Sequence, residues 1–437
     1  MFMKKLLLLF VSFVAFCSCD NGELDFTVPV EVQNETAIDS FYVSFEEALA
    51  HAEKVLGGET ATRASVTKRK VANHHMYVAN KSTRAVGDDV EVRFHVINFE
   101  NNQGYALVSA DRRTTPVYAY SETGNLDIED ATENTGFGDF MDAATEYYIA
   151  EIGLGSGDPL LPTDPNNPTL PITPVPTNPI QQLPMVELDG VNYYVDRDDI
   201  ELQNPGGVLV DVKWNQYWPY NYYCDHNEDA KFYSGFRDAA GCGPVAAGQI
   251  MAYFRYPQSY RDLSFDWNLI LSSPYYDERY TSYEWCADGA KATAMLLKEI
   301  GESAGTNYGT SSGTAIEKIH DMFIDFGYLC EGPSSFSSEK VKSSLNINEP
   351  VYMRGRNNGS GHSWVIDSYK QWKAVITYYH SYEPYALAFT NTIMYDVYYH
   401  CNWGYGPSSN YENMWLLDVF EGYSSNKRII YNIRPNI

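Results

Sequence analysis

The sequence predicts an α+β protein with a small first domain, a proline-rich linker and a larger second domain. Its 437 residues are enough for two or three domains of ordinary size. In the second half of the chain, helical patterns come first and strand patterns follow, an order typical of α+β folds. Nine prolines lie between Pro159 and Pro184, recurring at every third position as far as Pro174. That period is typical of an extended polyproline II segment, which cannot pack a core.

The composition narrows the possible classes of protein. Apolar residues make up 44% of the chain and aromatic residues 15%, which is enough to bury sizeable cores and argues against wholesale disorder. The 31 basic and 57 acidic residues give a net charge of −26. Because phosphate binding needs clustered Lys and Arg, this balance argues against a nucleic-acid partner. No stretch reaches the roughly 20 continuous apolar residues of a membrane-spanning helix.

The amino terminus has the pattern of an export signal. Lys4 and Lys5 precede an apolar run that ends at Phe16, and Cys17-Ser18-Cys19 follows. This resembles a bacterial lipoprotein signal with Cys19 as the lipidated residue. Cys17 is the alternative, although bulky Phe16 would then sit at the cleavage point. We therefore expect residues 1–18 to be removed.

Lipid chains on Cys19 would hold the exported protein on a membrane surface at the bacterial cell envelope or cell surface, from which processing could release it. Ordinary secretion with two incidental cysteines is the other interpretation. Five cysteines remain after the signal, an odd count that suggests one free thiol. The other four could form two bridges or lie buried as small apolar residues. These four are Cys224, Cys286, Cys330 and Cys401.

The first domain is expected at residues 19–155 and the linker at 156–185. Ser44 and Glu47 form a capping box that predicts the start of a helix. The segments VRFHVINF and YALVSAD alternate like strands around a hairpin signal. Together with these we expect a strand at Val117–Tyr120 and a helix at Phe137–Ile152. This unit contains no convergent catalytic constellation.

The second domain is expected at residues 186–437. Helical periodicity predicts helices at Val245–Phe254, Lys291–Ile300 and Ala315–Phe326, the last two ending at Gly301 and Gly327. Strand patterns follow from Pro350 onward, in VYMRG, HSWVIDSY, YDVYYHCNW, MWLLDV and RIIYNI. A cleft between a helical half and a strand half is a favoured place for a site.

Cys242 is the strongest candidate nucleophile. It lies between two glycines, and Pro244 suits the first turn of the helix that follows. A thiol at a helix N-terminus meets the positive end of the helix dipole, which favours the thiolate and lowers the pKa. A small residue buried at a tight turn is the plainer interpretation.

A thiolate that cleaves peptides also needs a proton donor and an oxyanion site. His362 lies at the start of a predicted strand after two glycines, where its imidazole can reach a cleft. Asn402 suits the role of orienting that imidazole, with His400 and Asp367 as rivals. Gln216, set among aromatic residues, is the candidate side-chain donor to the oxyanion, beside the Cys242 amide.

These segments together resemble the streptopain-like cysteine peptidases. WNQYWPYN, GCGPVAAGQIMAYFRYP, YGTSSG, PVYMRG, GHSWVID and HCNWGYG occur in the order found in that family, over residues 205–434. Residues 40–150 resemble the inhibitory propeptide of the family. The resemblance implies a papain-like peptidase of two subdomains, one helical and one of antiparallel strands, after a small α+β propeptide domain.

The resemblance also implies roles for individual residues. Cys242 would be the nucleophile, His362 the base and acid, Gln216 the oxyanion donor and Asn402 the orienter of His362. Trp403 would shield that contact, and the substrate cleft would be lined by Tyr308, Gly309, Ser311, Ser312 and Gly361. Two features depart from the family. Tyr405 stands where a second Trp is usual, and residues 370–399 form a longer connection that could reshape the cleft.

We therefore expect a secreted zymogen cysteine endopeptidase that works through a Cys thiolate/His pair and an acyl-enzyme, with no metal or organic cofactor. Its partners would be protein or peptide substrates, its own propeptide as an intramolecular inhibitor and a membrane surface. The resemblance implies an apolar S2 pocket. Two other functions stay open: a catalytically inactive papain-like binding or adhesion protein, and a cysteine enzyme that transfers the acyl group to an amine.

Overall fold

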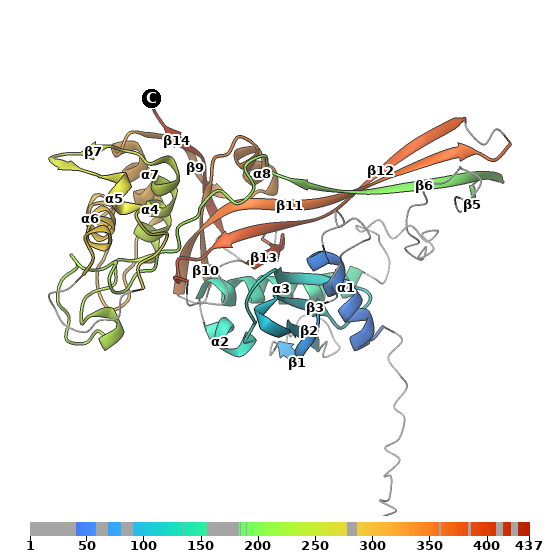
Figure 1. Ribbon diagram of the computed structural model, residues 1–437, viewed down its shortest axis with the longest axis horizontal. Coiled ribbons are helices and arrows are strands. Elements are labelled where there is room, and N and C mark those ends of the chain that lie inside the picture. Colours follow the sequence, from blue (N-terminus) through green and yellow to red (C-terminus); the bar gives the residue numbers. More distant parts are fainter. Residues whose placement is uncertain are drawn as a thin grey trace, which may run out of the picture. The chain divides into compact units, whose positions relative to one another are not determined.

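The computed structural model confirms the mixed α+β class, with helices and antiparallel strands (Figure 1). It describes residues 41–57, 69–79, 91–133, 135–154, 183, 185–188, 190–277, 286–357, 360–382, 386–407, 414–420 and 427–437. The predicted export signal with Cys17 and Cys19 lies outside these residues, as does most of the proline-rich linker. Among the described residues, no helix is both long enough and apolar enough to cross a membrane.

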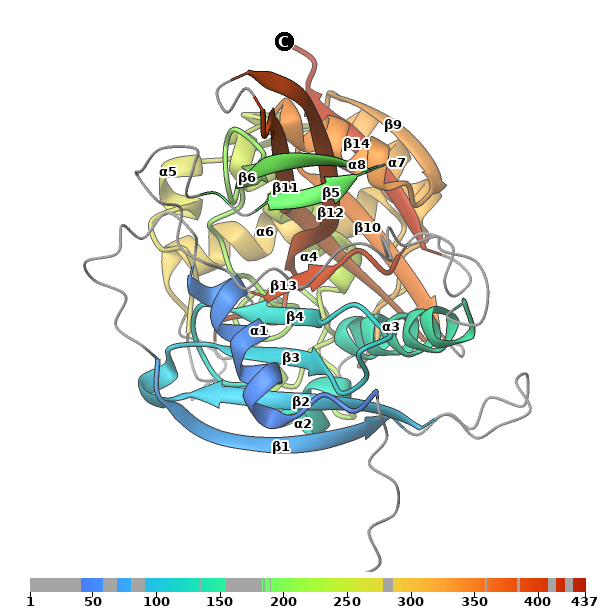
Figure 2. The same cartoon turned by 90° about the vertical axis from the view of Figure 1, so that its right-hand side faces the viewer.

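The first domain is a four-stranded antiparallel sheet in the order β1-β2-β3-β4, with helices packed on it. The predicted capping box opens α1, because the backbone N–H of Ser44 donates to the Glu47 carboxylate at 2.9 Å and the Glu47 N–H donates back to Ser44 Oγ at 3.3 Å. Figure 2 shows α1 lying across β2, β3 and β4. Its elements are α1 (Phe45–Gly57), β1 (Val71–Ala79), β2 (Val92–Phe99), η1 (Glu100–Asn102), β3 (Tyr105–Ser109), β4 (Val117–Ser121), α2 (Ile128–Glu133) and α3 (Thr135–Leu154).

The helical half of the second domain surrounds one buried helix, α4 (Cys242–Phe254). Every residue from Gly243 to Ala252 is buried, because α6, α7 and β11 all pack against this helix. Gly248 fits this crowding, since a Cβ there would lie 2.6 Å from Leu297 Cδ2. The other elements of this half are η3 (Phe232–Ser234), β7 (Ser259–Tyr260), β8 (Leu263–Ser264), α5 (Trp267–Ile270), α6 (Asp288–Ser303), α7 (Ile316–Asp325) and α8 (Ser338–Asn346).

The two predicted glycine stops fared differently. Gly327 follows Phe326, the C-cap of α7, and has a φ of 83°, so the expected helix end is confirmed there. Gly301 does not end its helix, since α6 continues to Ser303. Gly301 is instead a packing position, because a Cβ on it would collide with the hydroxyl of Tyr308. A helix-stop signal and a close-packing requirement look alike in sequence.

The strand half follows as predicted and joins the first domain edge to edge. Its antiparallel order is β13-β12-β11-β10-β14-β9, and β13 also pairs with β4 at Trp415–Tyr120 and Leu416–Ala119. With β5 and β6, the described strands form a 12-stranded sheet. The bounds are β9 (Tyr328–Ser335), β10 (Val351–Asn357), β11 (Ser360–His380), β12 (Leu387–Asn402), β13 (Met414–Leu417) and β14 (Arg428–Pro435).

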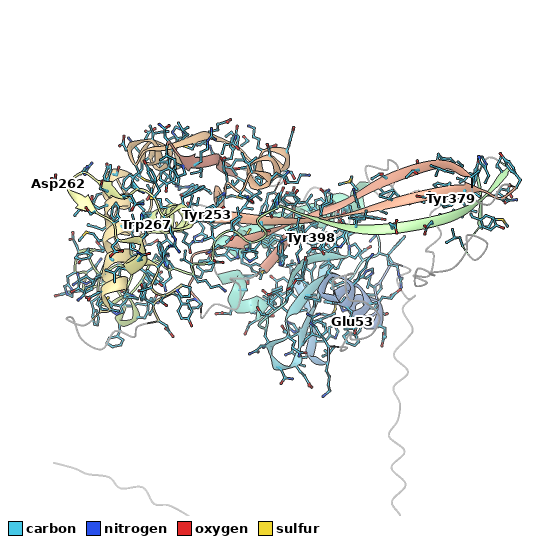
Figure 3. The ribbon with its side chains drawn as sticks, turned by 45° about the horizontal axis from the view of Figure 1, so that its top comes forward. Glu53, Tyr253, Asp262, Trp267, Tyr379 and Tyr398 are labelled. Atoms are coloured by element: carbon cyan, nitrogen blue, oxygen red, sulfur yellow. The ribbon has the colours of Figure 1, made fainter. Side chains whose placement is uncertain are left out.

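The long connection at residues 370–399 is a β-arm rather than a loop beside the cleft. The outer parts of β11 and β12 pair with each other, β6 (Val191–Gln203) pairs with β11, and β5 (Met185–Leu188) pairs with β6. Figure 3 shows Tyr379 near the far end of this arm and Tyr253 of α4 well away from it. β6 thus gives the outer part of β11 a strand partner, and an effect of residues 370–399 on the cleft stays a prediction.

Candidate active site

Cys242 begins α4 from a glycine turn. Gly241 has a φ of 97°, a backbone conformation that residues other than glycine rarely adopt. A Cβ on it would also lie 3.3 Å from both Pro244 Cδ and Ser312 Cβ. The turn places Cys242, which is half-buried, as the first residue of the buried helix α4. The nucleophile is thus held by a rigid element at its dipole-positive end.

His362, 3% exposed on β11, lies close enough to the Cys242 thiol for each side chain to shift the pKa of the other. Burial raises the pKa of that thiol, but the hydrogen bond and the charge of His362 outweigh burial and bring the pKa to about 7. Burial lowers the pKa of His362, but its contact with Cys242 outweighs burial and the net shift is upward. Both shifts favour a thiolate–imidazolium pair. The structure thus brings together the two residues on which the sequence argument depends.

The acceptor that orients the imidazole is a backbone carbonyl rather than the Asn402 side chain. Nε2 of His362 lies 2.8 Å from the carbonyl oxygen of Trp403, which leaves Nδ1 to face the thiol. The Asn402 amide is engaged elsewhere: it donates to the Val212 carbonyl at 2.8 Å and accepts from the Gly404 N–H at 3.2 Å. Our direct assignment of Asn402 is corrected accordingly. It is a positioning residue that fixes the turn carrying the Trp403 carbonyl.

The polar atoms of the two rival orienters are engaged with other partners. His400 Nδ1 and Asp367 Oδ1 lie 2.6 Å apart and form a buried pair of their own. The other Asp367 oxygen accepts from the Val210 N–H at 3.1 Å. This pair therefore ties the strand half to the segment before Trp214.

Gln216 lies beside the nucleophile turn, since its backbone carbonyl accepts from the Ala240 N–H at 2.8 Å. Its side chain contacts the hydroxyl of Tyr217. Burial raises the pKa of Tyr217, and the nearby Cys242 contributes to that rise. The segment that carries Gln216 is therefore next to Cys242, and its role as oxyanion donor stays a prediction.

The loop from Tyr308 to Gly313 packs against the same turn. Ser312 Oγ donates to the Ala239 carbonyl at 2.6 Å, and the Ala239 N–H donates to the Gly309 carbonyl at 2.9 Å. The backbone near Gly309 and the exposed Ser311 thus border the site. Tyr308 does not face it, because its ring lies 4.3 Å from Lys298 Nζ on α6 and its hydroxyl donates to the Lys298 carbonyl at 3.4 Å.

Aromatic rings enclose the imidazole. Trp403, 1% exposed, has its ring centre 6.3 Å from that of His362, and its role as a shield stays a prediction. Tyr405 stacks closer, at 4.9 Å, and Trp364 stacks at 6.1 Å. The sequence analysis noted Tyr405 only as a departure and did not include Trp364. The available signal for Trp364 was strand alternation, because a residue two positions after His362 lies on the same face of the strand.

A glycine of the first domain lies directly against His362 and Trp403. A Cβ on Gly136, in the first turn of α3, would lie 2.5 Å from Trp403 Cε3 and 2.8 Å from His362 Cδ2. The Gly136 N–H donates to the Tyr405 hydroxyl at 2.9 Å. Sequence reasoning missed this contact, because a glycine near a helix start suggests only local flexibility.

Asp139, one turn further along α3, is also buried at this contact. It is 5% exposed, and a Cβ on Gly355 would collide with its Oδ2. Burial raises its pKa to about 6, even though the charges of Lys427 and His362 oppose that rise. The sequence offered a signal for this residue, because Asp139 is an acidic residue on the apolar side of the helix predicted at Phe137–Ile152.

The five described cysteines, Cys242 among them, form no disulfide with one another. Burial raises the pKa of Cys224 and of Cys330 to about 12 in each case. Cys242 therefore stands apart as a thiol with a lowered pKa. In the part of the chain that the structure describes, no group of three or more His, Cys, Asp or Glu side chains is arranged to hold a metal ion.

Two family models match the chain. Residues 214–411 match the model described as the Peptidase C10 family. Residues 40–148 match the model described as Spi protease inhibitor. The first range contains all the residues that the sequence analysis assigned to the catalytic site, and the second contains Gly136 and Asp139.

Three known proteins are similar to this chain. Streptopain from Streptococcus pyogenes is 26% identical over 301 residues, which cover 60% of this chain and 65% of streptopain. The thiol protease/hemagglutinin PrtT of Porphyromonas gingivalis is 21% identical over 382 residues, covering 79% of this chain and 37% of PrtT. The matches thus span 65% or less of the length of these relatives. A solved prointerpain A fragment from Prevotella intermedia superposes with a TM-score of 0.49 at 16% identity, covering 83% of this chain and 98% of that one.

Proposed function

Because the chain is a streptopain-like cysteine peptidase with an inhibitor-type propeptide domain, we propose that it is a zymogen endopeptidase that hydrolyses protein substrates. The observation that carries the proposal is the Cys242–His362 pair, whose shifted pKa values favour a thiolate and an imidazolium. A helix of the first domain, α3, packs against His362. An inactive binding protein would have no need of a thiol with a pKa of about 7.

The chemistry follows from the pair. The Cys242 thiolate attacks the peptide carbonyl, and a C–S bond forms while the carbonyl oxygen becomes an oxyanion. The Cys242 N–H and the Gln216 side chain are the proposed donors to that oxyanion. His362 gives its proton to the leaving amine as the C–N bond breaks. Water, deprotonated by His362, then hydrolyses the thioester and restores the thiol.

Latency has a structural basis in α3. A substrate residue next to His362 would need the space that Gly136 occupies against Trp403, so helix and substrate compete for one surface. Two residue pairs between β4 and β13 extend the same contact. Activation therefore requires the propeptide to leave, and we propose that cleavage in or after residues 156–185 allows this.

The test uses full-length protein and its Cys242→Ala variant. Wild type should process itself and hydrolyse casein, and the variant should do neither while keeping the same circular dichroism spectrum. Mass spectrometry of both samples after incubation gives the processing boundary. If the variant still cleaved casein, Cys242 would not be the nucleophile.

The same assay separates hydrolysis from acyl transfer. Adding an amine such as putrescine should leave the product masses those of hydrolysis. Amine adducts as the main products would instead favour a transferase.

We also propose export with lipid attachment at Cys19, supported by the sequence pattern alone. Cells expressing the chain should incorporate labelled palmitate into it. A Cys19→Ser variant should lose the label, whereas Cys17→Ser should keep it. A label lost only in Cys17→Ser would move the attachment site.

A further inference from the structure

A cationic side chain lies next to the nucleophile and has no role in the proposed mechanism. Arg354 is on β10, where it faces Ser363 of β11 across the ladder. It shares a strand face with Tyr352, whose hydroxyl would lie 3.3 Å from a Cβ on Gly243, the residue after Cys242. The charge of Arg354 is close enough to Cys242 to favour the thiolate.

The guanidinium spans the two backbone segments that border the nucleophile. Nη1 donates to the carbonyl of Thr314, at the end of the loop that begins at Tyr308. Nη2 lies 3.3 Å from the position of a Cβ on Gly361, the exposed residue before His362. Gly313, just before Thr314, is exposed as well. A substrate chain lying between Gly361 and Gly313 would therefore have this guanidinium beside it.

Among the described residues, no ion pair joins Arg354 to a carboxylate. Among the described residues, the Thr314 carbonyl is its hydrogen-bond acceptor, and the nearby Glu317 is paired with Arg428. Arg354 lowers the pKa of Glu317 only as a weak contributor behind the hydrogen bond from Arg428. Since one of five N–H donors is used, the guanidinium keeps donors for a ligand.

We propose that Arg354 is a specificity-determining residue that binds a carboxylate side chain of the substrate, in the subsite bordered by Gly361 and Gly313. This inference rests on the proposed peptidase function. Arginine suits the role because its planar fork matches the two oxygens of a carboxylate, and a charge-assisted pair is stronger than a neutral hydrogen bond. The small residues on both sides leave room for a long acidic side chain such as glutamate.

The experiment measures kcat/KM on enzyme that has processed itself from the full-length zymogen. Paired fluorogenic peptides carry Glu or Gln at each of the four positions on either side of the cut. At one position, wild type should prefer Glu to Gln by about tenfold, the scale of one charge-assisted hydrogen bond. Because each ratio compares two peptides with one enzyme, any effect of Arg354 on the thiolate cancels.

Variants assign that preference to the guanidinium. Arg354→Gln should bring the Glu/Gln ratio to about one, and Arg354→Lys should keep part of it. Arg434→Gln removes a guanidinium from β14 that pairs with Glu349 at 3.5 Å, and it should leave the ratio unchanged. Titration of Cys242 with iodoacetamide gives the concentration of competent enzyme, so poor folding of a variant does not distort the ratio.

The outcomes separate the inference from the function on which it rests. Hydrolysis by wild type without preference for Glu at any position would overturn the inference and leave the peptidase function standing. A Glu preference that survives in Arg354→Gln would also overturn it. Failure of wild type to cleave any peptide, with Cys242 competent, would refute the proposed function and this inference with it.

Discussion

Gly136 offers a sharp test of the proposed latency. Replacing it with Ala adds one methyl group where Trp403 Cε3 would be 2.5 Å away and Trp403 Cζ3 2.7 Å away. Real Cβ atoms do not approach other heavy atoms this closely, so either α3 or the indole ring must move. Trp403 is 1% exposed and enclosed by other rings, so α3 is the element that should yield.

The expected magnitude follows from overpacking. Forcing an extra methyl group into a packed site costs about 1–3 kcal/mol, which corresponds to a roughly 5- to 150-fold larger undocked fraction. Helix propensity acts in the opposite direction, because Ala stabilises a helix by up to about 1 kcal/mol relative to Gly. Gly153 is the matched control on the same helix, since nothing lies within 4 Å of its Cβ position. Gly153→Ala should therefore preserve latency.

The assay is the rate at which iodoacetamide alkylates Cys242 in the intact zymogen, followed by mass spectrometry before processing occurs. Alkylation needs an accessible thiolate and no catalytic turnover, so it reports undocking directly. Gly136→Ala should react faster than wild type, and Gly153→Ala should match wild type. Equal rates in all three proteins would refute the view that α3 seals the catalytic pair.

Further predictions concern the charged groups and the capping box. Alkylation of Cys242 in wild type should show a pH midpoint near its pKa of about 7, and His362→Ala should raise that midpoint because the hydrogen bond and charge of His362 no longer oppose burial. Burial at the contact raises the pKa of Asp139 to about 6, so the docked form binds the proton more tightly than the undocked form. Docking should therefore weaken as the pH rises from about 4 to 6, and Asp139→Asn should flatten this pH dependence of latency. Asn402→Ala should lower kcat yet leave the alkylation midpoint near that of wild type, since the Trp403 carbonyl receives the imidazole hydrogen bond; a shift as large as that of His362→Ala would restore the direct role. Ser44→Ala should lower the free energy of unfolding by about 1 kcal/mol in urea titrations.

Local signals in the sequence predicted most of the elements because they arise within each element. The capping box at Ser44 and the turn at Gly327 are satisfied by residues a few positions away, so the chain reveals them directly. Gly301 misled because its reason lies in a contact with Tyr308. The β-arm was unpredictable in the same way, since β11 finds its partner in β6, more than 150 residues earlier.

The residues of the candidate site also differ in how far the sequence could predict them. Cys242 and His362 were predictable because thiol chemistry constrains residue type and local backbone. The orienting acceptor was not, because any residue supplies a carbonyl and the sequence cannot reveal which one faces Nε2 of His362. The prediction of Asn402 found the correct segment but the wrong contact, since the Asn402 amide fixes the turn that presents the Trp403 carbonyl.

The aromatic surface around His362 links catalysis to its own suppression. Trp403 and Tyr405 lie next to the imidazole of His362, and the same two rings receive Gly136 through van der Waals contact and a hydrogen bond. A substitution that improved this surface for the propeptide would therefore also alter the surroundings of the imidazole. Under the proposed function, one set of rings serves both states, so the propeptide would inhibit without deforming the Cys242–His362 pair, whose pKa shifts already favour the charged form.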